Sequence, residues 1–202
     1  VNRIKKALGV KKIGHSGTLD PFATGVLAIA IGEATKSIEL FNKSKTYEFY
    51  LSFGELKDTD DITGKTIKTS KNIPTKKDIG SCINNFLFNY EQVPPNYSAV
   101  KVDGVRAYKL ARKKKEFSLK AKKVQISNMN FFETDKTNEF RFVADCSTGT
   151  YIRSIARDLG AMLDTYAYVK ELRRTKIGKI TEKDIILLDK FEELVHIGDH
   201  FE

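Results

Sequence analysis

The stretch "GHSGTLDPFATGVLAIAIG", residues 14–32, places Asp20 on a loop rich in glycine, serine, threonine and proline. This composition favours neither helix nor strand for the loop. The apolar run at residues 26–31, bounded by Gly25 and Gly32, predicts a buried strand. One interpretation of Asp20 is that the Asp-Pro pair opens a turn. The other is that the glycines let the loop lie against a ligand, so that the carboxylate can act as nucleophile or general base.

The chain has 202 residues, with 35 lysines and arginines against 26 acidic residues, for a formal net charge of +9. The basic residues gather in short clusters, which suit a polyanion whose phosphates are neutralised at many points. Solvated surface lysines explain the same charge equally well on composition alone. The clusters are Lys5–Lys6, Lys11–Lys12, Arg112–Lys115, Lys120–Lys123 and Arg173–Lys179.

Hydropathy and cysteine usage exclude two classes of protein. No apolar run approaches the roughly 20 residues that span a bilayer, so no membrane segment is expected. The two cysteines, Cys82 and Cys146, predict a reducing compartment, no disulfide framework and two small core residues.

Two groups of residues invite a metal site without supporting one. The carboxylates of Asp58, Asp60 and Asp61 lack the spacing and terminal glutamate of an EF-hand, so a turn is expected there. His196 and His200 stand four residues apart, but no third ligand is near them. We therefore expect no metal.

Hydrophobic periodicity predicts an α+β fold with a largely antiparallel sheet, because strands and helices mix without strict alternation. No repeat or linker interrupts residues 1–202, which predicts one continuous domain. The expected strands are 26–31, 45–54, 123–132, 139–146 and 167–178. The expected helices are 1–9, 33–44, 78–88, 105–114, 150–163 and 188–197. Residues 57–65 are expected to turn, and the lysine-rich residues up to 80 to lie at the surface.

A second polar stretch, "CSTGTYIRSIARDLG" at residues 146–160, ends a strand and opens a helix. Arg153 should flank the apolar stripe of this helix. It is either a surface arginine lying beside the core, or a guanidinium aimed into a cleft to pair with a carboxylate or phosphate. Tyr47, in the strand at 45–54, by default faces the core.

Five motifs stand in order along the chain: "GHSGTLDPFATGVLAIAIGEATK", "KTYEFYLSFGELKDTDDITG", "QVPPNYSAVKVDGVRAYKLAR", "CSTGTYIRSIARDLG" and "ELRRTKIG". Together they give the chain, from Val1 to about Leu188, a resemblance to the TruB family of tRNA pseudouridine synthases. The resemblance implies the pseudouridine synthase fold, with a mixed, mostly antiparallel sheet, flanking helices and loops, and a central RNA-binding cleft. It also implies an isomerase that converts the T-loop uridine at tRNA position 55 to pseudouridine.

The resemblance assigns a role to individual residues. Asp20 matches the nucleophilic aspartate, Tyr47 the aromatic ring that stacks on the flipped base, and Arg153 the arginine that pairs with Asp20. His15 matches the loop position that meets the target as it leaves the T-loop stack. The remaining substrate-binding positions, which line the uridine pocket, are Tyr151 and Leu172.

The same resemblance implies a cytoplasmic monomer that binds the tRNA T stem-loop and uses neither metal nor organic cofactor. The chain departs from the family pattern at its ends, since an N-terminal strand with a Lys-Pro motif is missing before Val1 and an RNA-binding PUA domain is absent or cut off after Glu202. Two alternatives stay open. One is the core of a guide-RNA-dependent synthase that works with partner proteins, and the other is a non-catalytic RNA-binding module or tRNA chaperone.

Overall fold

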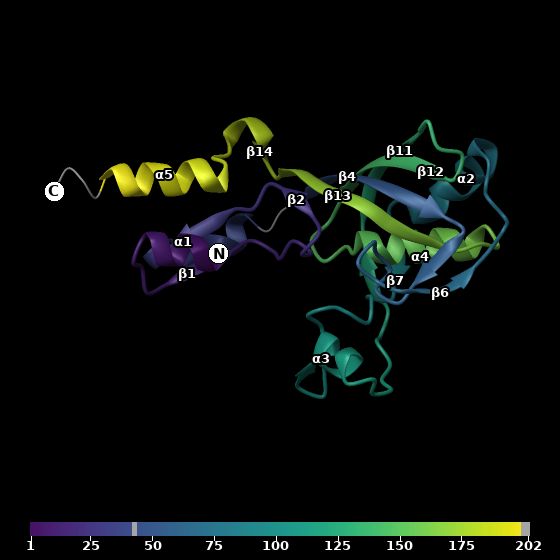
Figure 1. Cartoon of the computed structure of the whole chain (residues 1–202), viewed down its shortest axis with the longest axis horizontal. Helices are drawn as coiled ribbons and strands as arrows, with labels where there is room; N and C mark the ends of the chain where they lie inside the picture. Colours follow the sequence, from purple (N-terminus) through teal and green to yellow (C-terminus); the bar gives the residue numbers. More distant parts are fainter. Residues whose placement is uncertain (42–43, 199–202) are drawn as a thin grey trace. The chain divides into compact units, whose positions relative to one another are not determined.

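The computed structural model describes residues 1–41 and 44–198, which form two compact units (Figure 1). The end unit joins the two ends of the chain, Val1–Thr46 and Arg173–Glu202, and the central unit is Tyr47–Leu172. The chain passes between the units within β4 (Lys45–Phe53) and β13 (Ala167–Ile177). The union of the two units in one catalytic domain stays a prediction.

The core of the central unit is a sheet with strand order β11-β12-β4-β13. The strands β11 (Ile126–Glu133) and β12 (Glu139–Cys146) pair antiparallel, as the sequence predicts for these segments. Alternation along β4 is also confirmed, with Phe49 fully buried and stacked on Phe142 at 5.3 Å between ring centroids. Stacked aromatic rings of this kind stabilise beyond the area they bury.

Helix α4 (Ile152–Met162) confirms the helix predicted over 150–163. Its apolar stripe, with Ile155 and Leu159 fully buried, packs into the core. Gly160 allows close approach, because a Cβ there would lie 2.7 Å from the backbone nitrogen of Ala167. The contact fixes α4 against the start of β13, and so fixes the position of the residues in the first turn of α4.

Shorter elements complete the central unit. Helix α2 begins with a capping box between Thr75 and Asp78 and continues into a short 3₁₀ turn. The hairpins confirm a turn over 57–65 and leave the lysine-rich segment after it exposed. These elements are β5 (Glu55–Lys57), β6 (Thr66–Thr69), α2 (Lys76–Ile83), η2 (Asn84–Phe86), β7 (Tyr90–Gln92), β8 (Lys101–Val102), β9 (Val105–Arg106), α3 (Ala107–Arg112) and β10 (Lys122–Val124).

The end unit is built from short elements at both chain ends. The exposed side chain of Arg3, on the first helix, binds Asp189 and Glu192 on the last, which joins the two termini. The elements are α1 (Asn2–Ala7), β1 (Ile13–His15), β2 (Thr24–Gly25), β3 (Ile29–Ile31), η1 (Gly32–Phe41), β14 (Ile180–Thr181), η3 (Glu182–Asp184) and α5 (Leu188–Gly198).

Three sequence predictions in this unit were wrong. The strand expected over 26–31 shrinks to β3, which pairs only with β1 and leaves Ile31 38% exposed, because the amide of Val26 is taken by the carbonyl of Arg174 instead. The loop before it contains the end of β1 and the whole of the two-residue strand β2. The helix expected over 33–44 is a 3₁₀ helix. The hydroxyl of Thr35 donates to the Gly32 carbonyl at 2.8 Å, an i→i−3 bond that matches the tighter turn. Residues 42–43 lie outside the described part of the chain.

Of the two cysteines, Cys146 is buried as expected and Cys82 is half-buried, and both are free thiols. Burial raises the pKa of the Cys146 thiol to about 12. Across residues 1–41 and 44–198, no helix has the length and apolar character that crossing a membrane requires.

Gly25 gives the first testable prediction. Its φ is +102°, and a Cβ there would lie 2.2 Å from the carbonyl oxygen of Arg174. Gly25→Ala should therefore lower the free energy of unfolding by more than about 3 kcal/mol, because backbone must move. Gly9→Ala is the control, since Gly9 also has a positive φ, +61°, but has nothing within 4 Å of the added Cβ. Urea unfolding measures both, and equal losses would contradict the close approach.

Candidate active site

Asp20 lies on a half-buried turn of the end unit. The amide of Ala23 donates to the Asp20 carbonyl at 2.9 Å, which confirms the turn expected at the Asp-Pro pair. We call residues 16–26 the Asp20 loop. At the start of this loop, the amide of Ser16 donates to the carbonyl of Ala28 at 3.1 Å. The carboxylate is thus carried by a short turn with backbone anchors near its base.

Both ends of the Asp20 loop are bound by Arg174 on β13. Its Nε donates to the Val26 carbonyl at 2.8 Å, and its Nη2 donates to the Gly17 carbonyl at 3.2 Å. The side chain is only 1% exposed, so its inclusion in the basic surface cluster Arg173–Lys179 was wrong. Successive residues of a strand face opposite sides, so one arginine of the pair had to point inward, a signal that sequence reasoning missed.

A second buried cation lies close to the same loop. Lys45 is 4% exposed, and its Cε would be 3.6 Å from a Cβ at Gly17. Burial, and then the nearby charge of Arg174, lowers the pKa of the Lys45 ammonium. The Asp20 loop therefore begins against two buried, positively charged side chains.

His15 is on β1, opposite Ile29 in the register of the β1–β3 pair. Its Nδ1 is buried and, among the residues that the structure describes, has no hydrogen-bond partner. Asp20 and His15 are thus the two predicted site residues that belong to the end unit.

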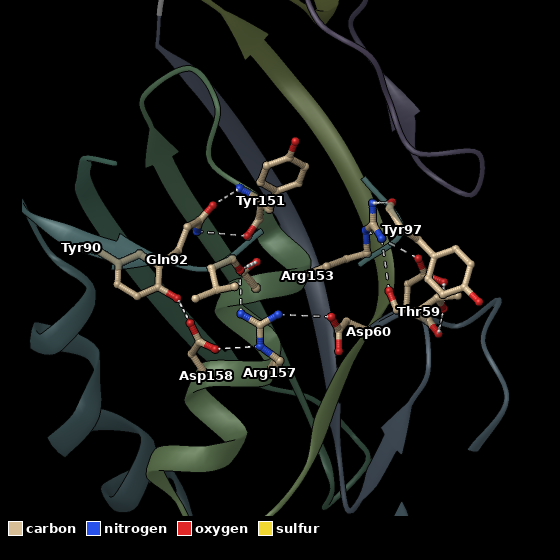
Figure 2. Close-up of polar contacts among 12 residues, drawn as sticks. Thr59, Asp60, Tyr90, Gln92, Tyr97, Tyr151, Arg153, Arg157 and Asp158 are labelled. Carbon is tan, nitrogen blue, oxygen red and sulfur yellow. Dashed lines mark hydrogen bonds and ion pairs between the residues drawn. The ribbon is translucent and has the colours of Figure 1, made fainter. Parts of the chain in front are cut away.

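Arg153, in the first turn of α4, is buried and bound on several sides (Figure 2). Its Nη1 and Nη2 donate to the carbonyls of Thr59 and Tyr97, each at 3.2 Å. Its Nε lies 3.6 Å from Oδ2 of Asp61, and both side chains are nearly fully buried. The alternative of a surface arginine was wrong, because the Arg153 side chain is buried. A buried guanidinium requires partners of this kind.

Asp61 belongs to the turn that sequence reasoning left as a plain acidic turn. Its Oδ1 accepts from the Thr59 hydroxyl at 2.8 Å and from the amide and hydroxyl of Thr63 at 2.9 and 2.6 Å. Val169 on β13 pairs with the same turn through its backbone. The turn is confirmed, but its buried carboxylate as the partner of Arg153 was missed, because no local pattern links residues so distant in sequence.

One helical turn further along α4, Arg157 makes a related cluster (Figure 2). It lies 3.6 Å from Asp60, donates to Asp158 at 2.9 Å and donates to the Val93 carbonyl at 2.7 Å. The hydroxyl of Tyr90 donates to Asp158 as well. Burial raises the pKa of Asp60 to about 6, while the charges of Arg157 and Arg153 oppose the rise. Burial also raises the pKa of the Tyr90 phenol, and its hydrogen bond to Asp158 raises it further.

The remaining predicted residues belong to the central unit. Gln92, which sequence reasoning also missed, is buried and binds the backbone of Tyr151 twice, accepting from its amide at 2.7 Å and donating to its carbonyl at 3.4 Å. Tyr47 on β4 and Leu172 on β13 are buried. The central unit therefore holds Tyr47, Tyr151, Arg153 and Leu172, and their meeting with Asp20 and His15 stays a prediction.

Within the described ranges, no three His, Cys, Asp or Glu side chains are grouped to hold a metal ion. His200 lies outside the described residues, and so does the side chain of its predicted companion His196.

Solved structures share this fold. The chain matches "Crystal Structure of a Cbf5-Nop10-Gar1 Complex" with a TM-score of 0.72 and 25% identity, over 97% of this chain and 50% of that one. It matches "Structure of H/ACA RNP bound to a substrate RNA containing 2'-deoxyuridine" with a TM-score of 0.69 and 22% identity, over 98% and 49% of the two chains. Together with the family models that match the chain, these structures identify the predicted pseudouridine synthase fold.

Family models and curated relatives agree with this fold. Residues 5–152 match the N-terminal domain of the TruB family pseudouridylate synthases, and residues 153–201 match the tRNA pseudouridylate synthase B C-terminal domain. Proteins named tRNA pseudouridine synthase B from Ehrlichia ruminantium, Ehrlichia chaffeensis and a Caulobacter species are 46%, 45% and 42% identical, over 98%, 96% and 96% of this chain. The chain spans 68%, 66% and 63% of their lengths.

The chain belongs to the TruB family of pseudouridylate synthases, a family of isomerases. The resemblance carried by the five sequence motifs is thereby confirmed.

The buried carboxyl of Asp60 gives a pH-dependent prediction. Its pKa of about 6 in the folded protein lies above the ordinary value of 3.8, so between these values the folded state binds more protons than the unfolded state. Its contribution to the free energy of unfolding therefore falls as the pH rises toward 6. The free energy of unfolding of the wild type minus that of Asp60→Asn should fall by on the order of 2 kcal/mol between pH 4 and pH 7.

Denaturant unfolding at the two pH values measures this difference. Asparagine tolerates the positive φ of this position, +60°, so backbone strain should not confound the result. Asp58→Asn, on the exposed part of the same turn, is the matched control. An equal pH-dependent change in both variants would contradict the assignment to Asp60.

Proposed function

We propose that the protein isomerises uridine 55 in the T loop of tRNA to pseudouridine, with Asp20 as the nucleophile. The observation that carries the proposal is the family match across residues 5–201, together with relatives of 42–46% identity that are named tRNA pseudouridine synthase B. The motif residues Asp20, Tyr47 and Arg153 are all present in this chain.

The reaction itself explains the residues it needs. The N1–C1′ bond of the nucleotide breaks, the uracil turns, and C5 joins C1′, so no electrons are gained or lost and the proposal requires neither metal nor organic cofactor. An ionised carboxylate can stabilise or trap positive charge at C1′, as the carboxylates of glycosidases do. Attack at C6 and removal of the 2′ proton are alternatives that use the same ionised Asp20.

Arg153 is proposed to keep Asp20 ionised. A nearby guanidinium favours the charged form of a carboxyl group and opposes the rise in pKa that burial causes. The contacts of Arg153 with Thr59, Tyr97 and Asp61 support this role, because they hold the guanidinium in one orientation. A group fixed in this way loses little freedom when it meets a second carboxylate.

The other predicted residues are proposed to receive the base. Flipping a stacked uridine out of the T loop costs a few kcal/mol, and stacking on an aromatic ring such as Tyr47 recovers about 1–3 kcal/mol. Tyr151 and Leu172 line the pocket in this proposal, and His15 meets the nucleotide as it leaves the stack. The hydrogen bonds between Gln92 and the Tyr151 backbone support a fixed position for that wall.

We propose that residues 101–123 of the central unit, which we call the basic arm, bind the tRNA backbone. In Figure 1 its helix α3 lies apart from the sheet of that unit. The arm carries Asp103 and Glu116 as its only acidic residues. Its exposed basic residues are Lys101, Arg106, Lys109, Arg112, Lys113, Lys114, Lys115, Lys120, Lys122 and Lys123. Lysines and arginines at this density suit the phosphates of a folded RNA, which is recognised mainly by shape and backbone.

Two observations rank the alternatives. Solved structures whose titles describe complexes with Nop10 or a bound substrate RNA are 22–25% identical to the chain, whereas the tRNA pseudouridine synthase B relatives are 42–46% identical. The higher identity favours a synthase that acts without guide RNA or partner proteins. We propose in addition that it is a monomer, as the family resemblance implies. Turnover of tRNA without added guide RNA or partner protein would discriminate it from the guide-dependent core, and any turnover excludes a purely non-catalytic chaperone.

Asp20→Asn is the decisive variant. It should reduce pseudouridine formation on an unmodified tRNA transcript by at least roughly a thousandfold, because the nucleophile is lost. The Kd for tRNA should stay within about threefold, a change of less than 1 kcal/mol. Mapping of the modified position measures the product, with a transcript bearing cytidine at position 55 as the substrate control.

Asp58→Asn serves as the matched protein control for this experiment and should retain activity. Turnover of Asp20→Asn at the wild-type rate would refute the assignment of the nucleophile.

Affinity for tRNA should fall steeply with salt, because neutralising phosphates releases counterions. Replacing Lys113, Lys114 and Lys115 together by glutamine should flatten the plot of log Kobs against log salt by about two to three units of slope. The control is the same replacement of Lys65, Lys68 and Lys71, which are exposed in or beside the β5–β6 hairpin. Equal effects of the two triple variants would mean that net charge alone matters and would count against the basic arm.

A further inference from the structure

We propose that Arg174 is a positioning residue for Asp20. The buried guanidinium of Arg174 holds the two ends of the Asp20 loop together. This inference rests on the proposed function, since it matters for catalysis only if Asp20 reacts. It concerns the end unit alone, where both residues lie. Strand alternation turns this arginine inward, but nothing in the sequence motif names the carbonyls that it binds.

The first observation is the pair of acceptors. The Arg174 side chain donates to the carbonyls of Gly17 and Val26, the residues that stand on either side of Asp20 where the loop begins and ends. Arginine presents five N–H donors in a rigid planar fork, so one side chain can fix two carbonyl oxygens at a set separation. Lysine offers a single ammonium on a flexible stem and cannot impose that geometry.

The second observation is the cost of the arrangement. The guanidinium is 1% exposed, both of these acceptors are neutral carbonyls, and the buried cation Lys45 lies near the same loop. Burying a guanidinium costs several kcal/mol, and a well-packed apolar residue is often as stabilising or more so. Packing alone therefore does not explain an arginine at this position, whereas control of the loop does.

The third observation separates the two ends of the loop. The exit is held by backbone as well, because the amide of Val26 donates to the Arg174 carbonyl at 2.7 Å and β2 pairs with β13. At the entry, the amide of Ser16 is anchored to the Ala28 carbonyl, and the carbonyl of Gly17, the next residue, is bound by the Arg174 side chain. Loss of the guanidinium should therefore release the loop from Gly17 onward, while backbone bonds keep Ser16 and the exit in place. Asp20, three residues after Gly17, would then lose its fixed position without loss of the fold.

The test compares Arg174→Lys and Arg174→Met with wild type in single-turnover reactions on a tRNA transcript. The rate at saturating enzyme should fall roughly 10- to 100-fold, the loss expected when a reacting group is displaced by about 1 Å. The Kd for tRNA should stay within about threefold. The control is Ile177→Val, which shortens a buried apolar side chain on the same strand and should leave the rate unchanged.

Amide hydrogen exchange gives a readout that does not depend on activity. In Arg174→Lys, exchange at Ala23, whose amide binds the Asp20 carbonyl, should accelerate at least tenfold, a shift of 1.4 kcal/mol in local opening. The amide of Val26 should keep its protection. Uniform acceleration across the end unit would show that Arg174 supports only the fold, and it would overturn the proposal. Because this readout uses Arg174→Lys, it remains decisive even if Arg174→Met fails to fold.

The two proposals fail in distinguishable ways. Full activity of Asp20→Asn would refute the assignment of Asp20 as the nucleophile. It would also refute the catalytic role of Arg174, which depends on that assignment. An inactive Asp20→Asn combined with wild-type turnover and exchange in Arg174→Lys overturns only the positioning role.

Discussion

Hydrogen bonds from buried guanidinium groups to backbone carbonyls hold the polar segments of both units. Arg174 binds the carbonyls of Gly17 and Val26 in the end unit, and Arg153 binds those of Thr59 and Tyr97 in the central unit. Loops cannot satisfy their own carbonyls as helices and sheets do, so a buried loop needs donors from elsewhere. Arginine supplies several donors from one side chain, and strands and helices of the core provide its rigid base.

The sheet and the long helix could be predicted from the sequence because their signals are local. Alternation from Tyr47 to Phe53 and the apolar stripe of α4 require only neighbouring residues. The 3₁₀ form of η1 could not be predicted, because it differs from an α-helix only by a shift of one residue in the backbone hydrogen bonds. The strand at 26–31 failed for a related reason, since the amide of Val26 binds a residue far along the chain.

The candidate site, too, was predictable from the sequence only in part. The motif residues were recognisable because a family pattern preserves their types, but their supports were not, because these partners lie far apart in sequence. Asp61 appeared as an acidic turn residue and Gln92 as the first residue of a motif, yet they bind Arg153 and the Tyr151 backbone. Arg174 is the exception, since strand alternation alone would have turned it inward.

The ion pair between Arg153 and Asp61 is a loose one, which is compatible with the proposed role of Arg153 toward Asp20. A separation of 3.6 Å exceeds hydrogen-bonding distance, so the two groups attract by charge, while Oδ1 of Asp61 is occupied by Thr59 and Thr63. A tight, bidentate pair would offset most of the arginine's charge, and a bare guanidinium would be too costly to bury. A separation of this kind, together with the carbonyls of Thr59 and Tyr97, lets the guanidinium stay buried in one orientation. In the proposed mechanism a guanidinium held in this way would favour the ionised form of Asp20.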